Sequence, residues 1–356
     1  MITLVLTYRN RDLRIVKKCL DSLNQQSLHL FHVVLVDYGS EAVFANNLKE
    51  LVKGYDFIQL ISCPVEGQLW NKSRAINIAL QQCNSPYFFV ADIDMLFRKD
   101  FIAQLSQLKS PDEVIYFKVG FLSKKESAKV CVFETYKVKH YSTEEATGMT
   151  LYPTDILKRI NGYDEFYHGW GAEDTDVHVR LINSGFKVRF YELEVLMLHQ
   201  WHQKAYRTKN SIAPFHNSLE KINQCYLKQT RNLGISKVNN NFGWGISPEE
   251  NSYKTLAIPT RFFTLTNEKD EIDAFLKGSL FNSKDMVLQF TVTESPFQKN
   301  FRNYIRKLIG KKFFEYYQID EVNNELLETL IVNFRNHPYQ YVYEQDKGII
   351  VLKIKF

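Results

Sequence analysis

The sequence contains few cysteines and no long apolar run. Its five cysteines are scattered through 356 residues without a Cys-x-x-Cys pair, which argues against a disulfide scaffold and a cysteine zinc site. No stretch reaches the roughly 18–20 apolar residues that a membrane-spanning helix needs. Residues 1–7 already form a strand-like run and lack the basic region of a signal peptide. We therefore expect reduced thiols and a cytoplasmic protein that touches the inner face of a membrane at most peripherally.

A large excess of charge of either sign is also absent. The net charge is only +5, which is too small to indicate a nucleic-acid-binding protein. It still permits anionic partners such as nucleotide sugars. Apolar residues make up 45% of the chain, which permits a sizeable core and argues against wholesale disorder.

Strand-like and helical patterns alternate at the start of the chain. The runs cover residues 2–7, 11–25, 31–36, 42–55 and 57–62. This order predicts parallel strands joined by right-handed crossovers, and hence an α/β sheet with helices on both faces. Ligands of such sheets bind at the carboxyl ends of the strands, where residues 7–11 and 37–40 are expected.

The composition of the chain changes after about residue 204. Lys, Asn and Gln become more frequent, and residues 239–245 read as a loop. We therefore predict a first domain over 1–205, a linker or extension over 206–252, and a small α+β accessory domain over 253–356.

Two aspartates, Asp92 and Asp94, follow the apolar strand pattern of residues 87–91. The period of two in an extended chain places both carboxylates on one side. Oxygen ligands at a strand end hold hard divalent cations such as Mg²⁺ or Mn²⁺, which in turn neutralise a diphosphate. The alternative is a chance Asp-x-Asp in a surface turn.

A second acidic motif, residues 169–176, reads Gly-Trp-Gly-Ala-Glu-Asp-Thr-Asp and precedes a helical pattern. The flanking glycines let a sugar approach Trp170 closely enough to stack on its ring. Glu173 or Asp174, in the first turn of the helix, can act as a general base on an acceptor hydroxyl. The alternative is a set of acids that caps the helix after a tight turn.

The remaining candidates are basic and histidine side chains. His199 follows an apolar run and is a candidate third metal ligand, which would favour Mn²⁺ over Mg²⁺, whereas we interpret His202 as an ordinary surface histidine. Lys72 and Arg74 can pair with phosphate or form a solvated helix start. Asp37 can accept a hydrogen bond from a pyrimidine N–H or stabilise a turn before Gly39.

Taken together, these motifs resemble a family 2 glycosyltransferase of the Rossmann-like GT-A fold, over about residues 1–205. Residues 36–40, Val-Asp-Tyr-Gly-Ser, resemble the family's Val-Asp-Asp-Gly-Ser, with Tyr38 in place of the second aspartate. Asp92-Ile93-Asp94 stands at its Asp-x-Asp position, and residues 160–165 resemble its Gly-Gly-Phe-Asp-Glu. Residues 169–176 are similar to the Gly-Trp-Gly-x-Glu-Asp-x-Asp block of galactosyl- and N-acetylgalactosaminyltransferases and of chondroitin-type polymerases.

The resemblance implies a role for each matching residue. The uridine and its phosphates would be held by Thr7, Arg9, Asp37 and Arg74. Asp92 would contact the donor sugar, while Asp94 and His199 would ligate the metal. Trp170 and Glu173 would hold the sugars, and Asp174 would be the catalytic base.

We therefore expect a metal-dependent inverting hexosyltransferase that uses Mn²⁺ or Mg²⁺. It would move a hexose or N-acetylhexosamine, of galactose or N-acetylgalactosamine type, from a UDP-sugar to a glycan or lipid-linked glycan acceptor in surface polysaccharide synthesis. Retaining N-acetylgalactosaminyltransferases have a related block, so the stereochemistry stays open. The alternative function is a catalytically silent glycan-binding or scaffold subunit of a polysaccharide-synthesis complex, and no nucleic acid partner is expected.

A basic, aromatic stretch lies near the end of the chain, at residues 302–314. It can lie on an anionic membrane where a lipid-linked acceptor is present. The alternative, which we favour, is a helix with a solvated basic face that packs on its own domain.

Overall fold

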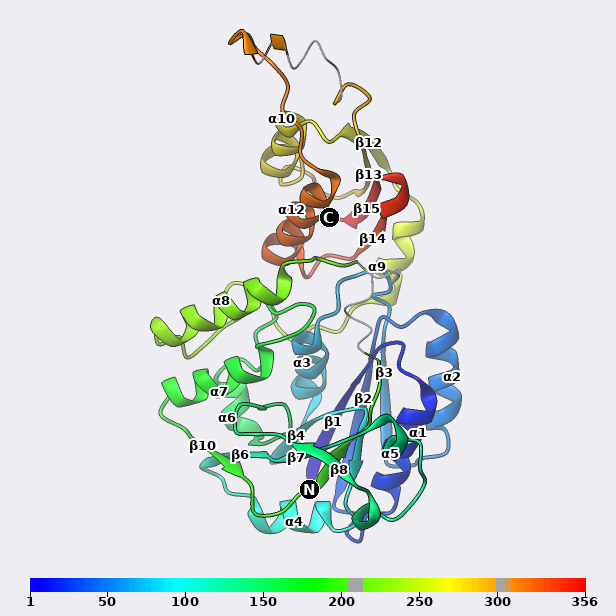
Figure 1. Cartoon of the computed structure of the whole chain (residues 1–356), viewed down its shortest axis with the longest axis vertical. Coiled ribbons are helices and arrows are strands. Elements are labelled where there is room, and N and C mark those ends of the chain that lie inside the picture. The colour runs from blue at the N-terminus through cyan, green and yellow to red at the C-terminus, as the bar shows by residue number, and fades with distance from the viewer. Residues whose placement is uncertain (204–213, 299–304, 307) are drawn as a thin grey trace. The chain divides into compact units, whose positions relative to one another are not determined.

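The computed structural model describes residues 1–203, 214–298, 305–306 and 308–356. The chain forms two compact units (Figure 1). The first comprises Met1–Cys63, Trp70–Thr208 and Leu219–Ser247, and the second comprises Pro64–Leu69, Lys209–Ser218 and Pro248–Phe356. The predicted division into 1–205, 206–252 and 253–356 stays a prediction.

The first unit contains a seven-stranded sheet with the strand order β10-β6-β9-β4-β1-β2-β3 (Figure 1). Its strands are β1 (Ile2–Tyr8), β2 (Phe31–Tyr38), β3 (Ile58–Cys63), β4 (Tyr87–Asp92), β6 (Glu113–Phe117), β9 (Thr150–Pro153) and β10 (Lys187–Tyr191). Strands β4, β1, β2 and β3 are parallel, as the β-α-β pattern predicts. Strand β9 runs antiparallel to both of its neighbours, so the sheet is mixed.

The first unit contains helices as well as strands. They are α1 (Leu13–Asn24), α2 (Ala42–Val52), α3 (Lys72–Gln82), α4 (Phe101–Leu108), α5 (Lys124–Ser127), α6 (Thr154–Arg159), α7 (Glu173–Asn183) and α8 (Leu219–Asn232). Helix α1 buries the face that its spacing predicts, with Val16, Cys19 and Leu23 inaccessible to solvent. Figure 1 shows α1 and α2 on one side of the parallel strands and α3 on the other. The predicted α/β class is therefore confirmed for the first unit.

A second, four-stranded sheet in the first unit has the order β5-β11-β7-β8. Its strands are β5 (Met95–Phe97), β11 (Met197–His199), β7 (Val119–Leu122) and β8 (Val138–Tyr141). Strand β11 runs antiparallel to β5, with His199 opposite Met95. This pairing brings the histidine segment next to Asp94, although more than a hundred positions separate them in the sequence.

The second unit is a small α+β body. Its elements are α9 (Glu250–Lys254), β12 (Arg261–Thr266), α10 (Lys269–Ala274), β13 (Val287–Thr293), α12 (Ile319–Thr329), β14 (Tyr339–Glu344) and β15 (Ile349–Lys355). A wider π-helical turn, Phe275–Ser279 and Leu330–Phe334 respectively, extends α10 and α12. The sheet has the order β12-β13-β15-β14, and only β12 and β13 are parallel.

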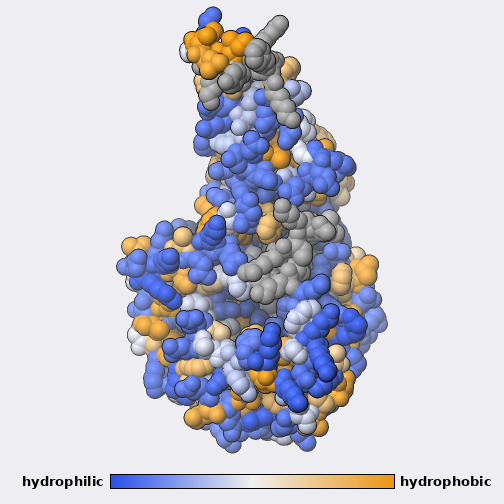
Figure 2. Space-filling model, viewed as in Figure 1, coloured by the Kyte–Doolittle hydropathy of each residue, from blue (hydrophilic) through white to orange (hydrophobic). Residues whose placement is uncertain are grey.

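Part of the basic, aromatic stretch of residues 302–314, namely residues 302–304 and 307, lies outside the described residues. Among its described residues, Leu308 and Ile309 expose 67% and 58% of their surface. Figure 2 shows apolar side chains gathered at one end of the second unit. In the described part of the chain, no helix has both the length and the hydropathy that crossing a bilayer requires.

Candidate active site

Polar residues gather where β4, β1 and β2 end. Because the three strands are parallel, their carboxyl ends meet at one edge of the sheet, and Thr7 lies opposite both Val36 and Asp92. Asp37 lies opposite Tyr8 in the same register. The register therefore brings Thr7, Asp37 and Asp92 to the same edge.

Asp37 is the best-defined group of the expected nucleotide pocket. It is only 3% exposed and accepts a hydrogen bond from the backbone N–H of Ser40 at 3.2 Å. Burial raises the pKa of its carboxyl, while Ser40 and the charge of Arg9 act in the opposite direction. The next residue, Tyr38, is buried and packs edge-on against Trp70, at 5.9 Å between ring centroids. Tyr38 therefore belongs to the core.

Arg74 lies on α3 and is 3% exposed. Its guanidinium donates to the carbonyl of Ile246 at 3.2 Å, so at least part of its hydrogen-bonding capacity serves the fold. The expected phosphate contact of Arg74 stays a prediction.

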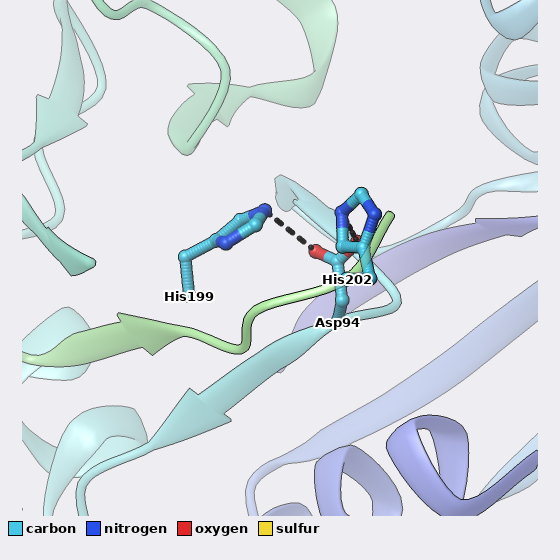
Figure 3. Close-up of side chains that lie close together, drawn as sticks. All are labelled: Asp94, His199 and His202. Carbon is cyan, nitrogen blue, oxygen red and sulfur yellow. Dashed lines mark ion pairs between the residues drawn. The ribbon is translucent and has the colours of Figure 1, made fainter. Parts of the chain in front are cut away.

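Asp94 forms the centre of a cluster with two histidines (Figure 3). Its Oδ1 lies 3.5 Å from Nε2 of His199, and its Oδ2 lies 3.1 Å from Nε2 of His202. One ligand atom from each of the three residues lies within 4.8 Å of the others. The guanidinium of Arg11 also lies 3.5 Å from Oδ2 of Asp94.

The electrostatics of this cluster favour an ionised carboxylate. Burial opposes ionisation of Asp94, but His199, His202 and Arg11 together hold the pKa of its carboxyl below the usual value. The hydrogen bond to Asp94 raises the pKa of His202. In the described part of the chain, Oδ1 of Asp94 is buried without a hydrogen-bond partner. A buried carboxylate whose two oxygens each lie beside one imidazole nitrogen fits a divalent cation.

The position of His202 corrects a sequence-based expectation. Its side chain is only 17% exposed and contacts Asp94, so the interpretation as an ordinary surface histidine is wrong. Backbone pairing explains the placement, because Gln200 donates its N–H to the carbonyl of Asp94 at 2.9 Å and carries the following residues past the aspartate. The His-x-x-His spacing directly after a strand was the available signal.

Lys72 holds a second cluster together, beside the first. Its Nζ lies 3.1 Å from Asp92, 3.8 Å from Glu173 and 2.9 Å from Asp174. Burial disfavours the charged ammonium, but these carboxylates raise the pKa of Lys72 well above its usual value. Lys72 therefore pairs with carboxylates in this structure, and its expected pairing with phosphate stays a prediction.

The carboxylates of Asp92, Glu173 and Asp174 share the ammonium of Lys72. Their combined negative charge favours a proton on one of them. Burial, followed by the charge of Asp174, raises the pKa of Glu173 to about 7. Burial also raises the pKa of Asp174, although Lys72 acts against it. Oδ1 of Asp174 is buried and has no hydrogen-bond partner among the described residues. The cluster can therefore take up a proton near neutral pH.

Helix α7 carries Glu173 and Asp174 in its first turn and begins directly after a residue in the left-handed conformation. Ala172, which precedes the helix, has a φ of 76° and makes no side-chain capping bond. Trp170 is 47% exposed. The third acid, Asp176, is fully buried and pairs with Arg180 at 2.6 Å. Asp176 is thus structural, whereas Trp170 presents an open surface.

Two family models match consecutive parts of the chain. Residues 3–128 match the model described as glycosyl transferase family 2, and residues 128–203 match the N-terminal domain of galactosyltransferase. The more specific assignment of the Gly-Trp-Gly block stays a prediction.

Several curated proteins are similar over part of the chain. Chondroitin sulfate synthase 3 of Homo sapiens is 26% identical over 168 residues, which are 43% of this chain and 18% of that protein. The teichoic acid poly(glycerol phosphate) polymerase of Staphylococcus epidermidis is 31% identical over 97 residues, 26% of this chain and 12% of the polymerase. The chain thus spans less than a fifth of the length of either relative.

Among solved structures, the crystal structure of GalNAc-T7 with UDP, GalNAc and Mn²⁺ is similar at a TM-score of 0.49 and 13% identity. The match covers 65% of this chain and 48% of the GalNAc-T7 chain. The two family models match residues 3–203 in succession, and both describe glycosyltransferases, which supports the predicted enzyme class. The mixed seven-stranded sheet has the predicted α/β architecture.

Proposed function

We propose that the chain is a metal-dependent, inverting glycosyltransferase. It moves a hexose or N-acetylhexosamine from a UDP-sugar to a glycan or lipid-linked glycan acceptor. The observation that carries this proposal is the pair of clusters that Asp92 and Asp94 begin at the end of one strand. The likeness to a chondroitin sulfate synthase supports a glycan-building reaction.

In this proposal the donor lies across the ends of β1, β2 and β4. Asp37 accepts a hydrogen bond from the uracil N–H, and Thr7 lies beside it at the strand end. Arg9 and Arg74 balance the charge of the diphosphate. Asp92, at the end of β4, contacts the donor sugar.

Asp94, His199 and His202 would hold the divalent cation. Two imidazoles beside one carboxylate favour Mn²⁺ over Mg²⁺. A cation bound there supplies positive charge that makes the diphosphate a better leaving group.

The chain's own side chains perform the remaining steps. Asp174 takes the proton of the acceptor hydroxyl on its unpartnered Oδ1. Lys72 fixes the other oxygen of Asp174 at 2.9 Å, so the base keeps one orientation. Trp170 stacks on a sugar, and Glu173 accepts a hydrogen bond from a sugar hydroxyl. Attack in line with the departing UDP inverts the anomeric carbon.

Calorimetric titration of UDP with and without Mn²⁺ tests the metal site. We expect Mn²⁺ to strengthen UDP binding in the natural protein and to have no such effect in Asp94→Ala, because that variant loses the carboxylate of the Asp94–His199–His202 cluster. Asp112→Ala, which removes an exposed aspartate elsewhere, is the matched control. Equal Mn²⁺ dependence in Asp94→Ala and the control would exclude Asp94 as a ligand.

A further inference from the structure

Helix α8 packs against α7 within the first unit (Figure 1). The four residues before α7, Gly-Trp-Gly-Ala at positions 169–172, form a turn that we call the Trp170 turn. Three of them have a positive φ, namely 75° at Gly169, 99° at Gly171 and 76° at Ala172. A left-handed backbone costs free energy at an alanine, so surrounding contacts have to hold this turn in place.

Asn223 of α8 supplies two of these contacts. Its side-chain amide donates to the carbonyl of His168 at 3.0 Å and to the carbonyl of Trp170 at 3.3 Å. The side chain is fully buried, and its Oδ1 has no hydrogen-bond partner among the described residues. A buried amide oxygen without a partner is costly, which favours a role for Asn223 beyond stability.

Other side chains of α8 also lie against the Trp170 turn. A Cβ added at Gly169 would lie only 3.2 Å from Cδ2 of Leu219, and one added at Gly171 would lie 3.8 Å from Nε2 of Gln224. The helical period places Leu219 and Gln224 on the same face of α8 as Asn223. This face therefore fits closely around the two glycines of the turn.

The Trp170 turn carries groups of the candidate active site. The ring of Trp170 stays open to solvent, with 47% of the residue exposed. Glu173 and Asp174 follow the turn directly, as the first two residues of α7. A further bond fixes the start of the turn, because Gly169 donates its N–H to the carbonyl of Trp70 at 2.8 Å.

We infer that Asn223 is a positioning residue for sugar binding. By bonding the carbonyls on either side of Gly169, it fixes the Trp170 turn and thereby the place of the indole on which a sugar stacks. The inference rests on the proposed function, since the sugar contact of Trp170 is part of that proposal. It gives α8, which lies outside the residues 3–203 that the two family models match, a part in substrate recognition.

Asn223→Asp tests the inference, because it keeps the shape of the side chain and replaces the donating amide nitrogen by an oxygen. Asn223→Ala, which adds no charge, is the second variant. The matched control is Thr230→Val, which removes a buried hydroxyl that bonds within α8, to the carbonyl of Tyr226. The Gly169 amide should exchange hydrogen faster in both Asn223 variants and at the natural rate in Thr230→Val.

Transfer kinetics measure the effect on the sugar. Trp170→Ala should raise the KM of the substrate whose sugar stacks on the indole. We expect Asn223→Asp to raise the same KM about fivefold, the effect of one neutral hydrogen bond. Because Asn223 is placed to act only on the turn, kcat and the Mn²⁺-dependent affinity for UDP should not change, and Thr230→Val should match the natural protein.

A double variant shows whether Asn223 acts through Trp170. Trp170→Ala combined with Asn223→Asp should have the same KM as Trp170→Ala alone, because the indole that Asn223 positions is already absent. Increases in KM that multiply would overturn the inference, and so would an unchanged exchange rate of the Gly169 amide in both Asn223 variants. If the natural protein transfers no sugar, the proposed function fails, while the exchange measurement still decides whether Asn223 fixes the turn.

Discussion

Asp174 holds Lys72 with one carboxylate oxygen and leaves the other, Oδ1, without a hydrogen-bond partner in the described structure. A buried carboxylate of this kind is costly to retain for stability alone. The arrangement suits a base that waits for a proton from the acceptor. Asp176, two residues further along, shows the contrast, because it is fully buried against Arg180.

Asp174→Asn should therefore separate binding from chemistry. We expect UDP affinity to persist and the transfer rate to fall by about a hundredfold to ten-thousandfold, the usual contribution of a general base. Single-turnover transfer and UDP titration on the same preparation measure the two. Asp155→Asn changes an exposed acid in the first turn of α6 and is the control. Transfer at the natural rate would exclude Asp174 as the base.

The acidic cluster also predicts how transfer depends on pH. Burial, then the charge of Asp174, raises the pKa of Glu173 to about 7. Below that pH the Glu173–Asp174 pair retains an additional proton, so less of the free base is present. We expect kcat/KM to fall as the pH drops below about 7 and to level off above it. A profile that stays flat across neutral pH would show that the pair does not titrate in the reaction.

His178 predicts a pH dependence of stability rather than activity. Burial lowers the pKa of its imidazole to about 3 from the ordinary 6.5, and its Nε2 lies 3.0 Å from Oγ1 of Thr150. Between these values the unfolded chain binds a proton that the folded chain does not. The free energy of unfolding should therefore fall with decreasing pH, by about 1.4 kcal/mol per pH unit.

Urea denaturation at neutral and mildly acidic pH measures this effect. His178→Gln cannot titrate and should lose the acid-dependent fall, whereas His29→Gln changes an exposed histidine and should retain it. The same acid sensitivity in both variants would place its origin outside His178.

At the scale of elements, the segment after α8 packs into the first unit. Gly245 donates its N–H to Oε1 of Glu165 at 2.7 Å, and an added Cβ would lie 2.6 Å from the carbonyl oxygen of Asn77 on α3. Asn77 in turn donates to Glu165 at 3.0 Å. This packing contacts α3 near its middle, at Asn77, rather than at its first residue.

Gly245→Ala should therefore cost more stability than backbone strain alone. Gly234 also has a positive φ, +62°, but nothing lies within 4 Å of an added Cβ, so Gly234→Ala measures the strain term. We expect Gly245→Ala to lower the free energy of unfolding by about 2 kcal/mol more, the usual cost of overpacking. Equal losses in thermal or chemical unfolding would show that the close approach relaxes freely.

Local patterns predicted the elements but not all of their pairings. The apolar spacing of residues 11–25 identified the buried face of α1, since that face follows the helical period. Strand β9 was harder to place, because its antiparallel position between β4 and β6 depends on long-range pairing. The pairing of β5 with β11 is of the same kind, and it is what brings His202 to Asp94.

In the candidate site too, local patterns predicted some residues, whereas contacts between distant parts of the sequence were not predictable. Asp94 and His199 could be selected from the sequence because each follows an apolar, strand-like run. Lys72 could not be placed among the carboxylates, since its partners lie on β4 and α7, 20 and about 100 positions away. Nor could the sequence indicate that Gly67 pairs with β14.

At the scale of the whole molecule, the two family models match residues 3–128 and 128–203. Donor binding should also stabilise the protein. With Mn²⁺ and UDP at about a hundred times the dissociation constant, we expect a gain of about 2.7 kcal/mol.

Thermal unfolding with Mn²⁺ alone, UDP alone and both together measures this gain. The largest increase in melting temperature should require both, because the proposed cation site at Asp94 and the proposed donor contact at Asp92 are two residues apart. Increases that merely add would indicate two independent sites.

The most direct measurement is UDP release from a panel of UDP-hexoses and UDP-N-acetylhexosamines, with and without Mn²⁺ and without acceptor. The account predicts slow, Mn²⁺-dependent hydrolysis of one donor, abolished in Asp94→Ala and retained in Asp112→Ala. Such a result would also identify the sugar. Hydrolysis that is independent of Mn²⁺, or the absence of hydrolysis together with no Mn²⁺-dependent binding of UDP, would contradict the account.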